Sequence, residues 1–300
     1  MPAPALCFAF DPIQDLHQER TRQIHSLFPS AVRAIERPAD AYCLAHHALE
    51  GAETAARADD TPTFGWYQTH PDANGTALAT PTAVGPRIIV SPDPDRMPRS
   101  SISDTAYYVL GPGTTSAPTD ELSLTTAAYA AAAHNGFGEL LADHAVVTCL
   151  LRRKTLGDTL VSWAITRLPG TVYTDHVDDP AVLARDLIHE AGHNWLNDGL
   201  TATKCDLGTS ETFYSPWRAE HRSAFGFIHA CWSFPLTMIY TARTLPETRG
   251  EVRRFLAAYL DQQRGLIART ADDHACALDL VSAPVLRHHL QTVYAMALDL

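Results

Sequence analysis

Apolar residues between positions 180 and 199 recur with the spacing of a helix that buries one face. The members of this stripe are Val182, Leu183, Leu187, Ile188, Ala191, Trp195 and Leu196. Asp179 is a good N-cap, and Pro180 fits the first helical position, where its missing N–H is not needed. Gly199 is a suitable stop. The sequence therefore predicts an amphipathic helix over 180–199 that packs against a core.

The same periodicities predict further elements on both sides of this helix. Helical patterns cover residues 12–36, 39–57, 125–144, 222–244, 247–269 and 284–299, with Pro235 as an expected kink. Strand-like runs cover residues 87–90, 106–110, 146–151, 161–166 and 171–174. Residues 60–120 are rich in Pro, Gly, Thr and Asp, which indicates an irregular lobe or long covering loops.

Composition indicates a globular protein and argues against some classes of binding partner. The 300 residues are 46% hydrophobic, and the formal net charge is −11. Nucleic-acid backbones and anionic membranes both need basic patches, so we expect neither as the main partner. No uncharged apolar run approaches the ~18 residues of a membrane-spanning helix.

Localisation is inferred from the N-terminus and from the cysteines. The first 14 residues have no basic region, and Asp11 interrupts their short apolar run, so they do not form a convincing signal peptide. The six cysteines are scattered without a CxxC pair, which favours reduced thiols over a disulfide framework. We therefore expect a cytoplasmic protein with all six cysteines reduced.

Residues 189–193 read His-Glu-Ala-Gly-His on the helix predicted at 180–199. Histidines four residues apart lie on one helix face, so His189 and His193 can reach one metal ion while Glu190 projects beside them.

A small sheet leading into a helix of this kind is typical of zincin-like α+β domains. We therefore expect an α+β, zincin-like fold with a small sheet and a mainly helical catalytic half. Residues 1–120 would form an N-terminal helical or irregular lobe and residues 121–300 the HExxH catalytic region, in one continuous compact unit.

Two histidines do not complete a metal site, so the third ligand decides the chemistry. The metzincin extension is excluded, because Leu196 and Gly199 occupy the positions of its Gly and His. Glu211 and Glu220 are available carboxylates, but neither lies in a convincing helix. His229 lies in an apolar helical run and is the third candidate; a core histidine is the alternative interpretation. His46, His47, His274, His288 and His289 are interpreted as surface or structural residues.

Five short motifs follow one another in the second half of the chain. They are LPGTVY at 168–173, LIHEAGH at 187–193, YSPWR at 214–218, Arg222, and GFIHA at 226–230. Over residues 165–245 this series resembles the HExxH-motif peptide-modification proteins of bacterial natural-product pathways. Members of that family are iron- and 2-oxoglutarate-dependent β-hydroxylases of ribosomally made peptides. The chain departs from the family pattern on both sides of Arg222, where His221 and Ser223 replace an Asp and a Pro, which leaves the role of Arg222 open.

The resemblance implies a ligand set and a set of roles. His189, His193 and His229 would bind Fe(II) and leave positions for the keto acid and dioxygen. Arg218 would hold the distal carboxylate of 2-oxoglutarate through its forked guanidinium, with Ser215 adding a hydrogen bond and Arg222 as the alternative anchor.

We accordingly expect a dioxygenase that hydroxylates a side-chain carbon, Cβ in the first instance, of a ribosomal precursor peptide. The alternative enzyme is a zinc metallopeptidase with Glu190 as general base. In the hydroxylase Glu190 would instead orient a metal ligand. A metal-stabilised peptide-binding module without catalysis is the third possibility.

Overall fold

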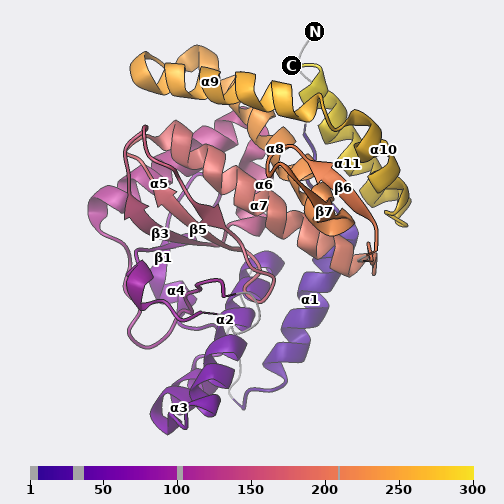
Figure 1. Cartoon of the computed structure of the whole chain (residues 1–300). Coiled ribbons are helices and arrows are strands. Elements are labelled where there is room, and N and C mark those ends of the chain that lie inside the picture. The colour runs from indigo at the N-terminus through magenta and orange to yellow at the C-terminus, as the bar shows by residue number, and fades with distance from the viewer. Residues whose placement is uncertain (1–5, 30–36, 100–103, 209) are drawn as a thin grey trace.

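The computed structural model describes residues 6–29, 37–99, 104–208 and 210–300. Its fold is mixed α+β, with long helices around a small sheet (Figure 1). The α-helices are α1 (Asp11–His25), α2 (Pro38–Arg57), α3 (Thr61–Thr69), α4 (Gly75–Leu78), α5 (Thr119–Ala132), α6 (Gly138–His144), α7 (Pro180–Ala202), α8 (Ala224–Thr244), α9 (Gly250–Ile267), α10 (Ala271–Asp279) and α11 (Pro284–Leu298). The strands are β1 (Ala79–Thr80), β2 (Arg87–Val90), β3 (Val147–Arg153), β4 (Ser162–Trp163), β5 (Thr171–His176), β6 (Thr212–Ser215) and β7 (Glu220–Ser223).

Five strands form one sheet in the order β1-β2-β3-β5-β4. The three central strands are parallel, and the short edge strands β1 and β4 are antiparallel to their neighbours. Strand β2 precedes residue 120 and pairs with β3, which follows it, with Ile88 opposite Val147. The two halves of the chain therefore share one sheet, and the division at residue 120 stays a prediction.

Helices cover both faces of this sheet. The adjacent residues Cys149 and Leu150 of β3 are both fully buried and point to opposite faces. Cys149 belongs to an apolar cluster with Leu44 of α2, and Leu150 belongs to a larger one with Leu187 of α7. In Figure 1 helices α1–α3 lie at the bottom, and α9–α11 lie at the top and right. Parallel strands buried on both faces account for the nearly unbroken apolar runs in the sequence.

Helix α7 is the centre of the molecule. It packs against α5, α6, α8, α1 and β5, so it meets both the sheet and the C-terminal helices. All seven apolar positions of its predicted stripe are 0% exposed. The predicted helix is confirmed, and it runs three residues beyond Gly199, to Ala202.

The strand predictions at 87–90, 146–151 and 171–174 are confirmed to within three residues. The prediction at 161–166 is only partly right, because pairing is limited to Ser162 and Trp163. The prediction of a strand at 106–110 is wrong: Ala106 forms an isolated bridge with Arg99, and no strand is assigned there. A strand-like side-chain pattern needs a neighbouring edge to pair with, and this segment has none beyond that bridge.

Two predicted helices are shorter or interrupted. The helix predicted at 125–144 consists of α5 and α6 joined by a π-helical turn, because Gly136 adopts a φ of 88°. The helix predicted at 12–36 ends at His25; residues 26–29 form a turn and a bend, and residues 30–36 lie outside the described ranges. Helix α10 and the β6–β7 hairpin were not predicted.

The interpretation of His46 and His47 as surface residues is wrong. His47 is 0% exposed; its Nε2 lies 2.9 Å from Thr171 Oγ1, and its Nδ1 accepts the N–H of Leu110 at 3.2 Å. The alanine-rich helix α2 packs against α1 and α3 and buries residues on most of its circumference, which the sequence alone did not reveal. His274 is a structural residue as expected, buried and stacked 3.6 Å from the ring of Tyr294.

None of the helices in the described ranges is long and apolar enough to cross a membrane. All six cysteines have free thiols; Cys7 and Cys276 are exposed, and the other four are buried.

Candidate metal centre

Helix α7 presents His189 and His193 from a rigid base. The Asp179 side chain accepts the N–H groups of Ala181 and Val182 at 2.9 and 3.1 Å, which confirms the predicted N-cap. The apolar stripe fixes the rotation of the helix, so the two histidines face away from the core. Their Nε2 atoms lie 3.2 Å apart, and their rings are nearly perpendicular.

Helix α8 brings His229 to the same place. Its ring stacks on that of His193 with centroids 5.1 Å apart, and the two Nδ1 atoms are 2.9 Å apart. The side chain is 6% exposed, and its Nε2 is buried without a hydrogen-bond partner. A histidine 36 residues from His193 in the sequence is thus in direct contact with it.

Close packing of α7 on α8 makes this contact possible. Gly192 lies at the crossing, where a Cβ atom would be only 2.8 Å from Leu236 Cδ1. The indole N–H of Trp232 donates to the carbonyl of Gly192 at 2.9 Å. The glycine inside the HExxH sequence therefore lets α8 approach closely enough for His229 to reach His193.

The detailed ligand geometry differs from the one implied by the resemblance. The ligand atoms that lie within 4.8 Å of one another belong to His189, Glu190 and His193. His229 meets the Nδ1 side of His193, whereas His189 meets its Nε2 side. The three histidines are thus brought together, but their nitrogens do not point at one centre. The torsion that orients an imidazole ring is broad, so a change of ring orientation at His193 or His229 would be needed for all three to bind one ion.

The environment keeps these imidazoles neutral, which is the form that binds metals. Burial lowers the pKa of His193 to about 4, and the Arg222 guanidinium acts in the same direction. Burial and the neighbouring His193 lower the pKa values of His189 and His229 well below the ordinary value.

Glu190 lies beside the histidine pair and is 2% exposed. Burial raises the pKa of its carboxyl to about 8; the hydrogen bond from Ser162 opposes this rise, and Asp186 adds to it. Ser162 Oγ donates to Glu190 Oε1 at 2.6 Å, while Oε2 is buried without a partner. One oxygen is therefore held in place by the edge strand β4, and the other is available.

Arg218 and Arg222 border the histidines from the β6–β7 hairpin. Both line the same two cavities as His189, His193 and His229. Among the described residues neither guanidinium has a hydrogen bond or an ion pair. Ser215 is fully buried with an unpartnered Oγ and lines the smaller cavity. The structure thus places every residue of the predicted site around one space.

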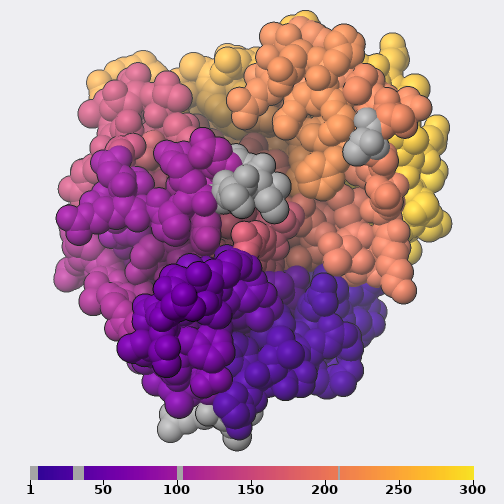
Figure 2. Space-filling view, turned by 60° about the horizontal axis from the view of Figure 1, so that its bottom comes forward, coloured from indigo at the N-terminus to yellow at the C-terminus, as the bar shows by residue number. Residues whose placement is uncertain are grey.

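This space consists of two adjoining cavities of about 570 and 240 Å³ that share the three histidines and both arginines. Trp163, Tyr107 and Phe225 line the larger one, and Phe234 lines the smaller one. The space-filling view is hollowed between the indigo-to-magenta N-terminal half and the orange segment that carries α8 (Figure 2). The site is therefore partly enclosed, with aromatic walls.

The alternative carboxylate ligands are not in this space. Glu211 and Glu220 are exposed at the ends of the β6–β7 hairpin, and neither lines the two cavities. The structure thus offers His229 and Glu190, rather than a downstream glutamate, as the third group beside His189 and His193.

Sequence reasoning missed two serines that contact the centre. Ser233 Oγ lies 3.0 Å from His193 Nδ1, and Ser162 holds Glu190. Ser233 follows His229 by four residues on a predicted helix, so helical spacing could have placed both on one face. No local signal identifies Ser162, because it reaches Glu190 from a strand 28 residues away.

No protein-family model and no curated protein matches this chain. The resemblance to HExxH-motif peptide-modification proteins therefore rests on the motifs alone and remains a hypothesis.

Proposed function

We propose that this protein is an Fe(II)- and 2-oxoglutarate-dependent hydroxylase of a ribosomally synthesised peptide. One observation carries the proposal: two guanidinium groups, neither with an ion-pair partner among the described residues, line the cavity that three clustered imidazoles also line. A keto diacid needs both a metal and a cation to hold its far carboxylate.

The donor atoms fit Fe(II). Imidazole nitrogens suit this ion, and the buried Nε2 of His229 and Oε2 of Glu190 are orphaned polar atoms, which a ligand or metal would satisfy. When bound together, Fe(II) and 2-oxoglutarate use O2 to convert a C–H bond into C–OH, with release of succinate and CO2. His189 and His193 would hold the ion in the proposal, with His229 as the third ligand.

The remaining residues bind and orient. Arg218 would pair with the distal carboxylate through two parallel N–H bonds, and Ser215 Oγ would donate a third hydrogen bond. Arg222 adds positive charge on the same side of the cavity. Trp163 and Phe225 line the larger cavity with apolar surface, which would hold the peptide side chain near the histidines.

The direct test measures keto-acid binding without the peptide. Anaerobic protein loaded with Fe(II) should show a visible charge-transfer band when 2-oxoglutarate is added. Arg218 is exposed at the rim of the cavity. Arg218→Ala should raise the concentration needed by ~100-fold, because the distal carboxylate loses its bidentate partner. Lysine should restore binding only in part, since it lacks the fork.

Arg254→Ala provides the matched control, because Arg254 is an exposed arginine on α9, far along the chain from the cavity. Arg222→Ala tests the second anchor. Absence of the band in the wild-type protein, or normal binding in both Arg218→Ala and Arg222→Ala, would contradict the proposal. If the wild-type protein binds 2-oxoglutarate as expected, succinate release on addition of the precursor peptide would identify the reaction.

A zinc metallopeptidase is the second candidate, and the geometry of Glu190 favours it. A carboxylate oxygen of this residue lies within 4.8 Å of the histidine ligand atoms, as a general base for a metal-bound water requires. Glu190→Gln distinguishes the two reactions. A peptidase should lose cleavage with its metal retained, whereas a hydroxylase should retain activity within ~10-fold.

A further inference from the structure

A second cluster of metal-ligating side chains lies deeper in the protein. It consists of His17 from α1, His144 at the end of α6, and Asp198 from α7, five residues beyond His193. Their exposed fractions are 2, 3 and 4%. Their ligand atoms all lie within 4.8 Å of one another, so three elements far apart in the sequence converge on one point.

Both imidazoles approach the same oxygen of the carboxylate. His17 Nε2 lies 2.9 Å and His144 Nδ1 lies 3.4 Å from Asp198 Oδ2. His144 Nδ1 has no hydrogen bond in the structure, although it is buried. A buried polar atom without a partner costs roughly 1–3 kcal/mol. Among the described residues His144 Nδ1 therefore has only the long 3.4 Å contact with the Asp198 carboxylate, without a well-formed hydrogen bond.

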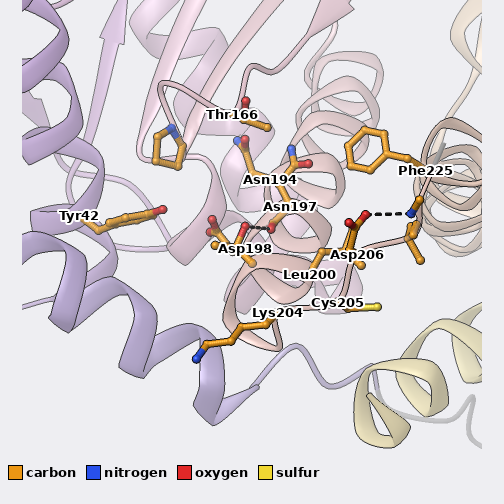
Figure 3. A pocket seen from close by; sticks show the side chains of 14 residues that line it. Tyr42, Thr166, Asn194, Asn197, Asp198, Leu200, Lys204, Cys205, Asp206 and Phe225 are labelled. Atoms are coloured by element: carbon orange, nitrogen blue, oxygen red, sulfur yellow. Dashed lines mark hydrogen bonds between the residues drawn. The ribbon is translucent and has the colours of Figure 1, made fainter. Parts of the chain in front are cut away.

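A cavity of about 570 Å³ gives access to this cluster from one side. Tyr42, Asn194 and Asp198 line it, and Figure 3 shows the hydroxyl end of Tyr42 directed toward Asp198. The Tyr42 ring also stacks on His17 with centroids 4.3 Å apart. The cavity thus reaches the cluster at Asp198, with the Tyr42 hydroxyl directed toward it.

We propose that His17, His144 and Asp198 form a second metal site, suited to Zn²⁺, that holds α1 against α7. Two imidazole nitrogens and one carboxylate oxygen are a common set of protein ligands for zinc, and a water molecule can complete a tetrahedral site. The bound cation would satisfy His144 Nδ1 and neutralise Asp198. The site is independent of the proposed hydroxylase activity, because it shares no ligand with the first centre.

The alternative interpretation is a hydrogen-bonded network in which Asp198 alone connects the two histidines. The two interpretations differ in one respect: the network needs no metal, whereas the zinc site is complete only with one. Metal content and stability can therefore distinguish them, provided that the first centre is removed.

The experiment uses His193→Ala as the background, because this change disables the first centre. The purified protein is stripped with a chelator, incubated with Zn²⁺, separated from free metal and analysed for zinc. One equivalent should remain bound, and Zn²⁺ should raise Tm by roughly 5 °C. Adding Asp198→Asn or His17→Gln should eliminate both effects.

His274→Asn in the same background is the matched control, because His274 is an equally buried histidine outside the cluster. It should retain the zinc. Substitution with Co²⁺ identifies the ligands: imidazole and carboxylate should give visible d–d bands without the near-ultraviolet band of a thiolate, which excludes Cys205 of the same cavity.

Failure of the His193→Ala protein to retain zinc would overturn the proposal. Zinc retention that is unchanged by His17→Gln would also overturn it. This variant keeps Asp198 in place, so it provides the test if Asp198→Asn does not fold. In either case the cluster is a hydrogen-bonded network.

Discussion

The two histidine clusters are built on the same helix but have different electrostatic surroundings. His193 and its neighbours line an open cavity, together with two arginines that have no ion-pair partner among the described residues. His17 and His144 are closed in around Asp198, which supplies a negative charge between them. Both clusters contain a carboxyl group, Glu190 in the first and Asp198 in the second. Among the described residues, only the first cluster shares its cavity with arginines, which suit a metal that carries an anionic co-substrate. The arginines, rather than the histidines, distinguish the two regions.

The largest expected effect lies in the open cluster. His229→Ala should lower hydroxylation by at least ~1000-fold with a small change in stability, because it removes a ligand from a cavity wall. The measurement is succinate release with the precursor peptide. His221→Ala, an exposed histidine on the adjacent strand β7, should be normal. Activity of His229→Ala within ~10-fold of wild type would show that another group completes the centre.

In the closed cluster we expect substitution to change mainly the stability of the protein. Asp198→Ala leaves two buried imidazoles without their partner and should lower the free energy of unfolding by ~3 kcal/mol. Urea unfolding in the presence of a chelator measures this independently of any metal. Asp206→Ala is the control, because Asp206 is exposed in the same cavity and accepts only a local N–H from Gly208. A loss below ~1 kcal/mol would remove the distinction between the clusters.

The smallest effect concerns Ser162, which orients Glu190 within the open cluster. Ser162→Ala removes a hydrogen bond worth about 1–2 kcal/mol and should change hydroxylation by no more than ~10-fold. In a peptidase it should cause a larger loss, because the general base would no longer be held in position. Ser123→Ala, which removes an exposed hydroxyl on α5, is the comparison. A loss of peptide cleavage above ~100-fold, where the wild-type protein cleaves the peptide and does not hydroxylate it, would support the hydrolase interpretation.

Local rules predicted the elements that are stabilised locally. The N-cap at Asp179 and the apolar stripe identified α7, because both depend on residues within one or two turns of each other. Three strands were also predicted correctly, because a short continuous apolar run is a local pattern. Such a run is typical of a strand that is buried on both faces of a sheet. The 106–110 segment failed because strand formation also needs a partner edge, which no local pattern specifies.

Backbone conformation was a second reason why the sequence did not predict every helix correctly. The helix predicted at 125–144 is interrupted at Gly136, whose positive φ permits a turn that most other residues would resist. The sequence contains that glycine, but only the packing around it determines whether the helix continues or bends.

The sequence by itself determined that His189 and His193 share one face of a capped helix with Glu190 beside them, since helical geometry places residues four apart together. It also supplied Arg218, Ser215, Arg222 and His229 as candidates through a series of motifs. Only the tertiary structure decided that these residues border one cavity, that His229 reaches His193 across the Gly192 crossing, and that His17 and His144 meet Asp198. Contacts between distant segments depend on how the helices pack, and packing is a property of the whole core rather than of any short stretch of sequence.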